Sequence, residues 1–218
     1  SIFFKIISQY SLFCGKLIKG LKFIYSQRDG IYMPYTKEYK RIPWKFLDEY
    51  RGNYFNGEWP TFPELLKIQV ERWGERPYFT DFEGPGNSKN TLTYKQTYEK
   101  ILNTAKWLIE NGLKKGDKVA VTGKNGPEWG IAYLATLVAS GIVIPIDNGL
   151  HENEAENLVN VSRPPLIFSD EEKFTFFKDK FPKISVKALN PNQADDYIYS
   201  LSVTKDVKMN EPVSENDT

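Results

Sequence analysis

The sequence is poor in the residues that build disulfides and most zinc sites, because its 218 residues include one cysteine, Cys14, and one histidine, His151. A single cysteine cannot form a disulfide within the chain. The pair cannot complete the four-ligand set of a structural zinc site either. We therefore expect no bound metal and a reducing compartment, the cytoplasm.

The sequence also lacks an excess of either charge, since 29 basic residues face 28 acidic ones and the formal net charge is +1. No overall field attracts nucleic acid or acidic substrates, so we expect no nucleic-acid partner. The residues are 40% hydrophobic and 15% aromatic, which is typical of a globular chain that buries one sizeable core.

Residues 1–26 contain no run of ~20 apolar residues that could span a membrane, and the first 25 residues include no acid. On a helix, Lys5, Lys16, Lys19 and Lys22 fall on one side. The other side carries twelve apolar residues: Ile2, Phe3, Ile6, Ile7, Tyr10, Phe13, Cys14, Leu17, Ile18, Leu21, Ile24 and Tyr25. This predicts an amphipathic helix lying on a surface. Two surfaces remain open: an anionic bilayer, contacted peripherally through residues 1–25 at the inner face of the membrane, or this protein's own core or a partner subunit.

Residues 27–60 are rich in aromatic and charged side chains without a clear period. We interpret them as an extended connector that packs over a domain. A platform for single-stranded nucleic acid is disfavoured because Asp48, Glu49 and Glu58 interrupt the basic residues.

Residues 61–190 show the alternation of helix and strand patterns that is typical of an α/β domain. The domain should begin with a helix, a small hairpin and a second helix. We expect these elements at 61–74 with Thr61 as cap, at 77–83 paired with 91–93, and at 93–112 with a Thr93/Gln96 capping box.

The centre of the domain is residues 118–147, which read as strand, helix and strand in the length that a parallel crossover needs. The helix begins at Pro127 and is apolar nearly all round, which indicates burial on more than one side. Gly141 is expected to end it in a left-handed conformation, and Ile142–Ile146 to form a strand covered on both faces.

Further elements should complete a mainly parallel sheet with helices on both faces. They are a helix at 152–161, a strand at 166–169, a helix capped by Asp170, and a strand near 184–189. Residues 191–218 form a C-terminal segment in which the helix and strand patterns weaken. We expect its polar end to contain no helix or strand.

Gly123, Gly126 and Gly130 follow a strand, and Asp147 ends the next one, so a dinucleotide-binding domain is an alternative. The glycines stand at relative positions 1, 4 and 8 rather than 1, 3 and 6, which favours a turn with tight helix packing.

Three other features favour structural roles over catalysis. Residues 84–90 join two strands rather than feeding a helix, which predicts a hairpin turn instead of a phosphate loop. His151 reads as a capping or solvated residue. The carboxylate runs 170–172 and 195–196 read as helix caps or solvated faces.

Five short segments occur in a fixed order: Leu92-Thr-Tyr, Gly116-Asp-Lys-Val-Ala-Val, Asn125-Gly-Pro-Glu-Trp, Leu137-Val-Ala-Ser-Gly-Ile-Val-Ile-Pro-Ile-Asp, and Leu166-Ile-Phe-Ser. Together they resemble the N-terminal region of the adenylate-forming (AMP-dependent) synthetase and ligase superfamily. The resemblance covers about residues 62–218. The aromatic lead-in and Trp59-Pro-Thr-Phe look most like bacterial long-chain fatty acyl-CoA synthetases.

Two positions depart from the amino-acid-activating branch, whose members commonly carry lysine where Val138 stands and alanine or glycine where Ser140 stands. These departures argue against a peptide synthetase.

The resemblance implies a two-step ligase. A fatty acid carboxylate attacks the α-phosphate of Mg-ATP to give an acyl-adenylate and pyrophosphate, and the thiolate of coenzyme A then displaces AMP. ATP, Mg²⁺ and coenzyme A are thus implied for the full-length parent. Its phosphate-binding loop would come shortly after a segment that residues 216–218 resemble, and its adenylation lysine further on.

No catalytic, cofactor-binding or metal-binding residue can therefore be assigned within these 218 residues. We expect an N-terminal fragment that is inactive alone and supplies scaffold and part of the acyl or coenzyme A wall. The alternatives are a non-catalytic, membrane-associated scaffold module and the dinucleotide-binding domain.

Overall fold

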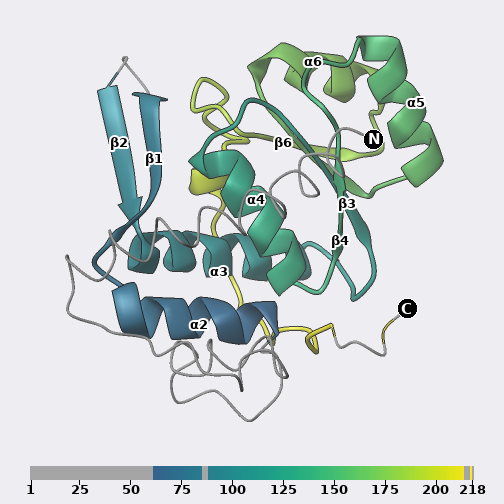
Figure 1. Ribbon diagram of the computed structural model, residues 1–218. Helices are drawn as coiled ribbons and strands as arrows, with labels where there is room; N and C mark the ends of the chain where they lie inside the picture. Colours follow the sequence, from purple (N-terminus) through teal and green to yellow (C-terminus); the bar gives the residue numbers. More distant parts are fainter. Residues whose placement is uncertain (1–60, 85–87, 214–216, 218) are drawn as a thin grey trace, which may run out of the picture. The chain divides into compact units, whose positions relative to one another are not determined.

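The computed structural model describes residues 61–84, 88–213 and 217 (Figure 1). The expected amphipathic helix at 1–26 and the aromatic connector at 27–60 lie outside the described residues. The domain boundaries proposed from the sequence therefore remain predictions.

The described chain opens with helix α2 (Phe62–Trp73), the antiparallel hairpin β1 (Pro77–Gly84) and β2 (Ser88–Thr93), and helix α3 (Tyr94–Glu110). Both helices begin at the expected caps. The backbone N–H of Thr61 donates to Glu64 at 2.7 Å, and Gln96 N–H donates to the Thr93 hydroxyl at 3.2 Å. The hairpin is confirmed, although β2 starts at Ser88, three residues earlier than expected.

The central unit is confirmed as β3 (Lys118–Thr122), α4 (Pro127–Val138) and β4 (Ile142–Pro145). β3 and β4 pair in parallel, with Val119 opposite Val143. No residue of α4 is exposed, as its all-round apolar sequence predicted.

The left-handed residue after α4 is Ser140 and not Gly141, so that expectation was wrong. Ser140 has φ 63°. Its hydroxyl donates to the carbonyl of Glu211 at 2.7 Å, which helps to hold the unusual conformation. Gly141 is needed for space instead, because a Cβ there would lie 3.0 Å from Thr136 Cγ2 and 3.1 Å from the carbonyl oxygen of Asp117.

The remaining elements complete a four-stranded sheet with the order β4-β3-β5-β6, in which every pairing is parallel. They are α5 (Glu152–Ser162), β5 (Leu166–Ser169), α6 (Glu171–Lys180), β6 (Ser185–Ala188) and the short 3₁₀ helix η5 (Ile198–Ser200).

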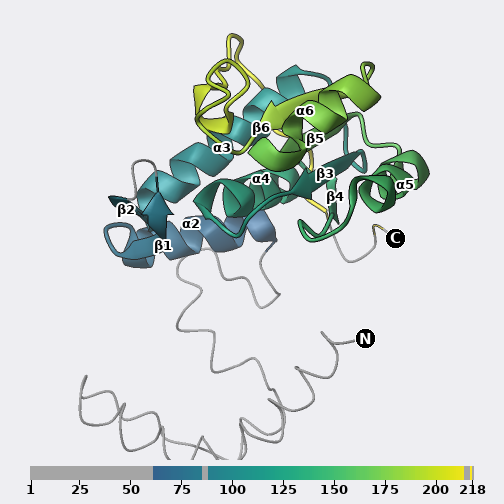
Figure 2. The same cartoon turned by 90° about the horizontal axis from the view of Figure 1, so that it is seen from above.

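The two faces of the sheet bury separate cores. Alternate residues of β3 and β5, such as Val121 and Phe168, face the core shared with α3 and α4. The residues between them, Ala120 and Ile167, face the core shared with α5 and α6. The expected α/β fold with helices on both faces is thereby confirmed (Figures 1 and 2).

Strand β4 is less covered than its apolar sequence predicted. Val143 packs against the first core and Ile144 against the second, but Ile142 is 48% exposed. The reason is position, since β4 is one of the two edge strands of the described sheet.

Residues 201–213 contain no helix or strand, as expected near the C-terminus, yet hydrogen bonds to earlier parts of the chain hold them in place. Asn103 donates to the carbonyl of Leu201 at 2.7 Å, Thr204 N–H donates to Glu110, and Asn210 donates to the carbonyl of Ala139 at 2.8 Å. We call residues 201–213 the C-terminal strap. Its partners lie 71 to 98 residues away in sequence, which is why the sequence did not reveal the contacts.

The C-cap of α5 provides a test of backbone strain. Arg163 is exposed and left-handed, with φ 50°, a conformation that costs a residue with a Cβ ~1–2 kcal/mol. Arg163→Gly should raise the free energy of unfolding by about 0.5–1 kcal/mol in urea titrations, because the greater unfolded-state entropy of glycine offsets part of the relief. Arg163→Ala removes the same side chain but keeps the Cβ, and an equal gain from it would contradict this explanation.

Candidate functional site

The sheet reverses its direction of winding between β3 and β5. The crossover through α4 leads from β3 to β4 on one side, and the crossover through α5 returns past β3 to β5 on the other. In open α/β sheets, ligands bind in the crevice beyond the carboxyl ends of the strands at such a switch point. The loops after β3 and β5 therefore define the candidate site.

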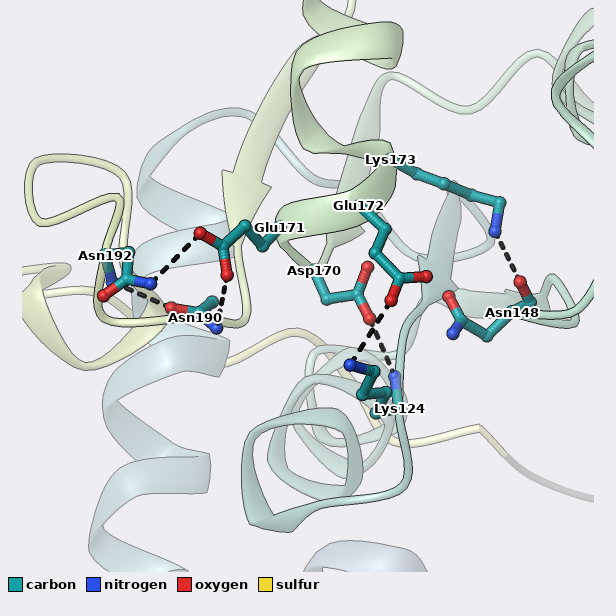
Figure 3. A network of polar contacts seen from close by, with 8 residues as sticks. All are labelled: Lys124, Asn148, Asp170, Glu171, Glu172, Lys173, Asn190 and Asn192. Carbon is teal, nitrogen blue, oxygen red and sulfur yellow. Dashed lines mark hydrogen bonds and ion pairs between the residues drawn. The ribbon is translucent and has the colours of Figure 1, made fainter. Parts of the chain in front are cut away.

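Asp170, the N-cap of α6, ties these two loops together (Figure 3). Its side chain is buried, and Oδ2 accepts a hydrogen bond from the backbone N–H of Lys124 at 3.0 Å. The Lys124 ammonium also lies 3.3 Å from Glu172, but both side chains are largely exposed, so this ion pair contributes little stability.

The first turn of α6 also holds the loops after β4 and β6. Glu171 accepts hydrogen bonds from the side-chain amides of Asn190 at 3.4 Å and Asn192 at 3.1 Å. The buried Lys173 ammonium donates to the backbone carbonyl of Asn148 (Figure 3). One helix end thus connects the loops that follow all four strands.

The crevice beside this network has a volume of about 530 Å³ and a strongly acidic wall. Asp81, Glu128, Asp170, Glu171 and Glu172 line it, against the single cation of Lys124. Like charges disfavour phosphate here, and the Lys124 amide that could meet an anion is already bonded to Asp170.

The glycines of the dinucleotide alternative do not form a cradle. Gly123, at φ 154°, packs where a Cβ would lie 3.2 Å from both Asp170 Cβ and Leu189. Gly126 is the N-cap of α4, and Gly130 sits inside that helix, where a Cβ would lie 2.6 Å from Phe79. Asp147 instead accepts a hydrogen bond from Gly149 N–H at 2.8 Å. The geometry supports the tight-packing interpretation.

The other sequence candidates also have structural roles. His151 is the exposed N-cap of α5, with its backbone N–H bonded to Glu154 at 3.0 Å. Asp170 occupies the expected N-cap position of α6, but its side chain makes no capping hydrogen bond and accepts from Lys124 N–H instead. Cys14 lies outside the described residues. Within the described part of the chain, no group of three His, Cys, Asp or Glu residues is placed to hold a metal, and no helix is long and apolar enough to cross a membrane.

Asp196 differs from the solvated or capping residue expected of the run 195–196. Its carboxylate accepts hydrogen bonds from Lys178 on α6 and Lys187 on β6, both at 2.7 Å. Burial alone would raise the pKa of Asp196, but the two lysines outweigh it and the pKa is lowered.

A polar cluster beside the crevice was not visible in the sequence. The Tyr197 hydroxyl donates to Glu128 at 2.8 Å, and the Lys100 ammonium lies 3.7 Å from the ring centroid of Tyr199. Burial, reinforced by the charge of Glu128, raises the pKa of Tyr197 and Tyr199 far above the usual range. No pattern in the sequence indicated this contact, because Tyr197 and Glu128 lie 69 residues apart.

The fold and the crevice define a doubly wound α/β domain whose carboxyl edge is closed by its own side chains. The chain belongs to the AMP-binding enzyme family, whose sequence pattern matches residues 66–218. The family expected from the ordered motifs is thereby confirmed.

Relatives and solved structures agree with this assignment. Over 86 residues, which is 39% of this chain and 13% of the relative, the sequence is 35% identical to long-chain-fatty-acid–CoA ligase ACSBG2 of Rattus norvegicus. It is 30% identical over 121 residues, 54% of this chain and 5% of the relative, to nonribosomal peptide synthetase NPS2 of Ceriporiopsis subvermispora.

The crystal structure of a proposed long-chain-fatty-acid CoA ligase from Rhodopseudomonas palustris shares the fold, with a TM-score of 0.60 and 15% identity over 70% of this chain and 38% of that one. This chain spans only a small fraction of the length of the two curated relatives, 13% of ACSBG2 and 5% of NPS2.

The buried tyrosines give an alkaline-pH prediction. Above pH ~10, the unfolded chain releases phenol protons that Tyr197 and Tyr199 retain in the folded state, so the free energy of unfolding should fall as pH rises. Tyr197→Phe should make this fall shallower in urea titrations between pH 9 and 11. It should also leave the native-state absorbance titration of phenolate unchanged while reducing that of the urea-unfolded chain by one tyrosine. A loss of one phenolate from the native titration would show that Tyr197 ionises normally.

Proposed function

We propose that this chain is the N-terminal portion of an ATP-dependent fatty acid–CoA ligase that forms an acyl-adenylate and then an acyl-CoA. The observation that carries the proposal is the family match over residues 66–218, together with the order of helices, strands and crossovers in this fold. The substrate class follows from the 35% identity to a long-chain-fatty-acid–CoA ligase.

ATP, Mg²⁺ and coenzyme A would be cofactors of the longer protein. The crevice described above does not fit a triphosphate, because five carboxylates line it and its Lys124 amide is bonded to Asp170. We assign this part of the chain the role of buried support, and we assign it no step of the chemistry.

Activation of an amino acid is the second candidate, because a peptide synthetase is among the relatives. Val138 and Ser140 favour the fatty acid branch, as they replace the residues common in amino-acid-activating members. Ser140 is moreover built into this fold by its hydrogen bond to Glu211.

We further propose that the longer protein is cytoplasmic and contacts the inner face of the membrane through residues 1–25. Four lysines and no acid in this segment complement anionic lipid, and most of its apolar residues would share one side if the segment were helical.

Pyrophosphate exchange tests the catalytic proposal. The purified 218-residue chain should show no fatty-acid-dependent ATP–pyrophosphate exchange above background. The full polypeptide of the reading frame that contains it should show exchange with fatty acids and none with amino acids. Exchange by the 218-residue chain would refute its role as an inactive portion, and exchange driven only by amino acids would refute the substrate class.

Vesicle co-sedimentation tests the membrane proposal. The 218-residue chain should bind anionic vesicles and release them as salt is raised, whereas a variant that lacks residues 1–25 should remain in the supernatant. A variant with Lys5, Lys16, Lys19 and Lys22 replaced by Gln keeps the apolar side and should bind more weakly. Equal sedimentation of the intact chain and the deletion variant would remove residues 1–25 as the anchor.

A further inference from the structure

The crevice beyond the carboxyl edge of the sheet holds more negative charge than the described residues around it neutralise. Its walls carry the five carboxylates named above and one ammonium, that of Lys124. The N-termini of α4 and α6 also lie here, at Gly126 and Asp170, but each helix end adds only about half a positive charge. The crevice therefore favours a cationic ligand.

Asp170 gives a second and independent reason to expect a ligand. The residue lines the crevice and is 8% exposed. Its Oδ2 atom accepts the hydrogen bond of the Lys124 backbone N–H, whereas Oδ1 is buried and has no hydrogen-bond partner in the described part of the chain (Figure 3). Because a buried polar atom without a partner is costly, a donor brought by a ligand would stabilise this carboxylate.

The side chains next to Asp170 can make room for such a donor. The Lys124 ammonium lies 3.3 Å from Glu172, and the two side chains are 76% and 58% exposed. An ion pair this exposed contributes little stability, so a ligand ammonium can replace that of Lys124 on Glu172 at little cost. The ligand then lies beside Asp170.

The acids reach the crevice from three separate elements. Asp81 comes from β1, Glu128 from α4, and residues 170–172 from the start of α6. Glu128 accepts one hydrogen bond, from Tyr197, and a carboxylate has about four acceptor sites. Charges distributed in this way match a ligand whose ammonium groups are spaced along a chain better than they match a single ion.

The same crevice offers apolar surface to the rest of such a ligand. Trp129, Leu189 and Pro191 line it together with the acids. Their side chains can pack against methylene groups, and the face of the Trp129 ring attracts an ammonium. The volume of about 530 Å³ lies within the range of small-molecule sites.

We propose that this crevice binds a linear polyamine, whose ammonium groups donate to Asp170 and the neighbouring glutamates and whose methylene groups pack on Trp129. The ligand takes the place of the Lys124 ammonium on Glu172. The site stands apart from the proposed function, and its test requires no acyl transfer.

Isothermal titration with spermidine tests the proposal, at about 0.15 M salt to screen exposed charges. The 218-residue chain and the full polypeptide of its reading frame should each show one saturable site, and butylammonium, with a single charge, should show none. Absence of saturable spermidine heat would overturn the proposal. So would displacement of spermidine by Mg²⁺ at equal charge concentration, which indicates a site for any cation. Binding that is lost in the full polypeptide would show that its own residues fill the crevice, which also overturns the proposal.

Two matched double variants separate this site from general attraction between charges. Glu171→Gln with Glu172→Gln, and Glu152→Gln with Glu154→Gln, each remove two acids from the first turn of a helix. The α6 pair should weaken spermidine binding about tenfold, because charge-assisted hydrogen bonds become neutral ones. The α5 pair should leave binding unchanged, and equal weakening by both pairs would refute the site.

Lys124→Gln makes the opposite prediction. It removes the competing ammonium and keeps the backbone N–H that bonds to Asp170, so spermidine should bind about 2- to 5-fold more tightly. Weaker binding would contradict the proposed exchange on Glu172.

Amide NMR locates the bound polyamine without any substitution. Spermidine should shift the Lys124 amide resonance, since that N–H donates to Asp170, and should leave the amide of Gln96, at the start of α3, in place. Saturable heat without a shift at Lys124 would place the ligand elsewhere and overturn the assignment.

Discussion

Parallel pairing of β3 with both β4 and β5 is the constraint on which the rest of this structure depends. Parallel neighbours cannot be joined by a tight turn, so each pairing requires a crossover, here through α4 and α5. The sheet is consequently covered on both faces, and the strands between the helices must be apolar on both sides. Val119, Ala120 and Val121 are fully buried for this reason.

The same topology explains why the polar groups gather where they do. All four strands end at one edge, so the loops that follow them meet there, and their backbone groups need partners. The first turn of α6 supplies two of these partners, because Asp170 accepts from the backbone N–H of Lys124 and Lys173 donates to the backbone carbonyl of Asn148 (Figure 3). Glu171 adds a contact to the side-chain amide of Asn192. An edge that binds ligands in other doubly wound domains is held together here by the protein's own side chains. This agrees with a supporting role in the proposed ligase.

Local sequence signals predicted the elements well where the signal and its cause are close together. The Thr93/Gln96 capping box, the start of α4 at Pro127 and the Asp170 cap each depend on residues within one helical turn. The predictions failed where a distant residue decided the outcome. Gly141 was expected to be left-handed because glycine tolerates that conformation, but the left-handed residue is Ser140, whose hydroxyl donates to the carbonyl of Glu211. Gly141 is needed for space beside Thr136 and Asp117 instead.

The sequence by itself determined the fold class, the family and the order of the elements, because hydrophobic period, capping and motif order are all written along the chain. Only the tertiary structure decided which groups meet. It placed Glu128 where its carboxylate accepts a hydrogen bond from Tyr197, and it holds the C-terminal strap through the hydrogen bonds of Asn210 and Ser140. It also left β4 at one edge of the described sheet. These contacts join residues 69 to 71 positions apart, and strand order depends on how crossovers pack, so no local pattern could reveal them.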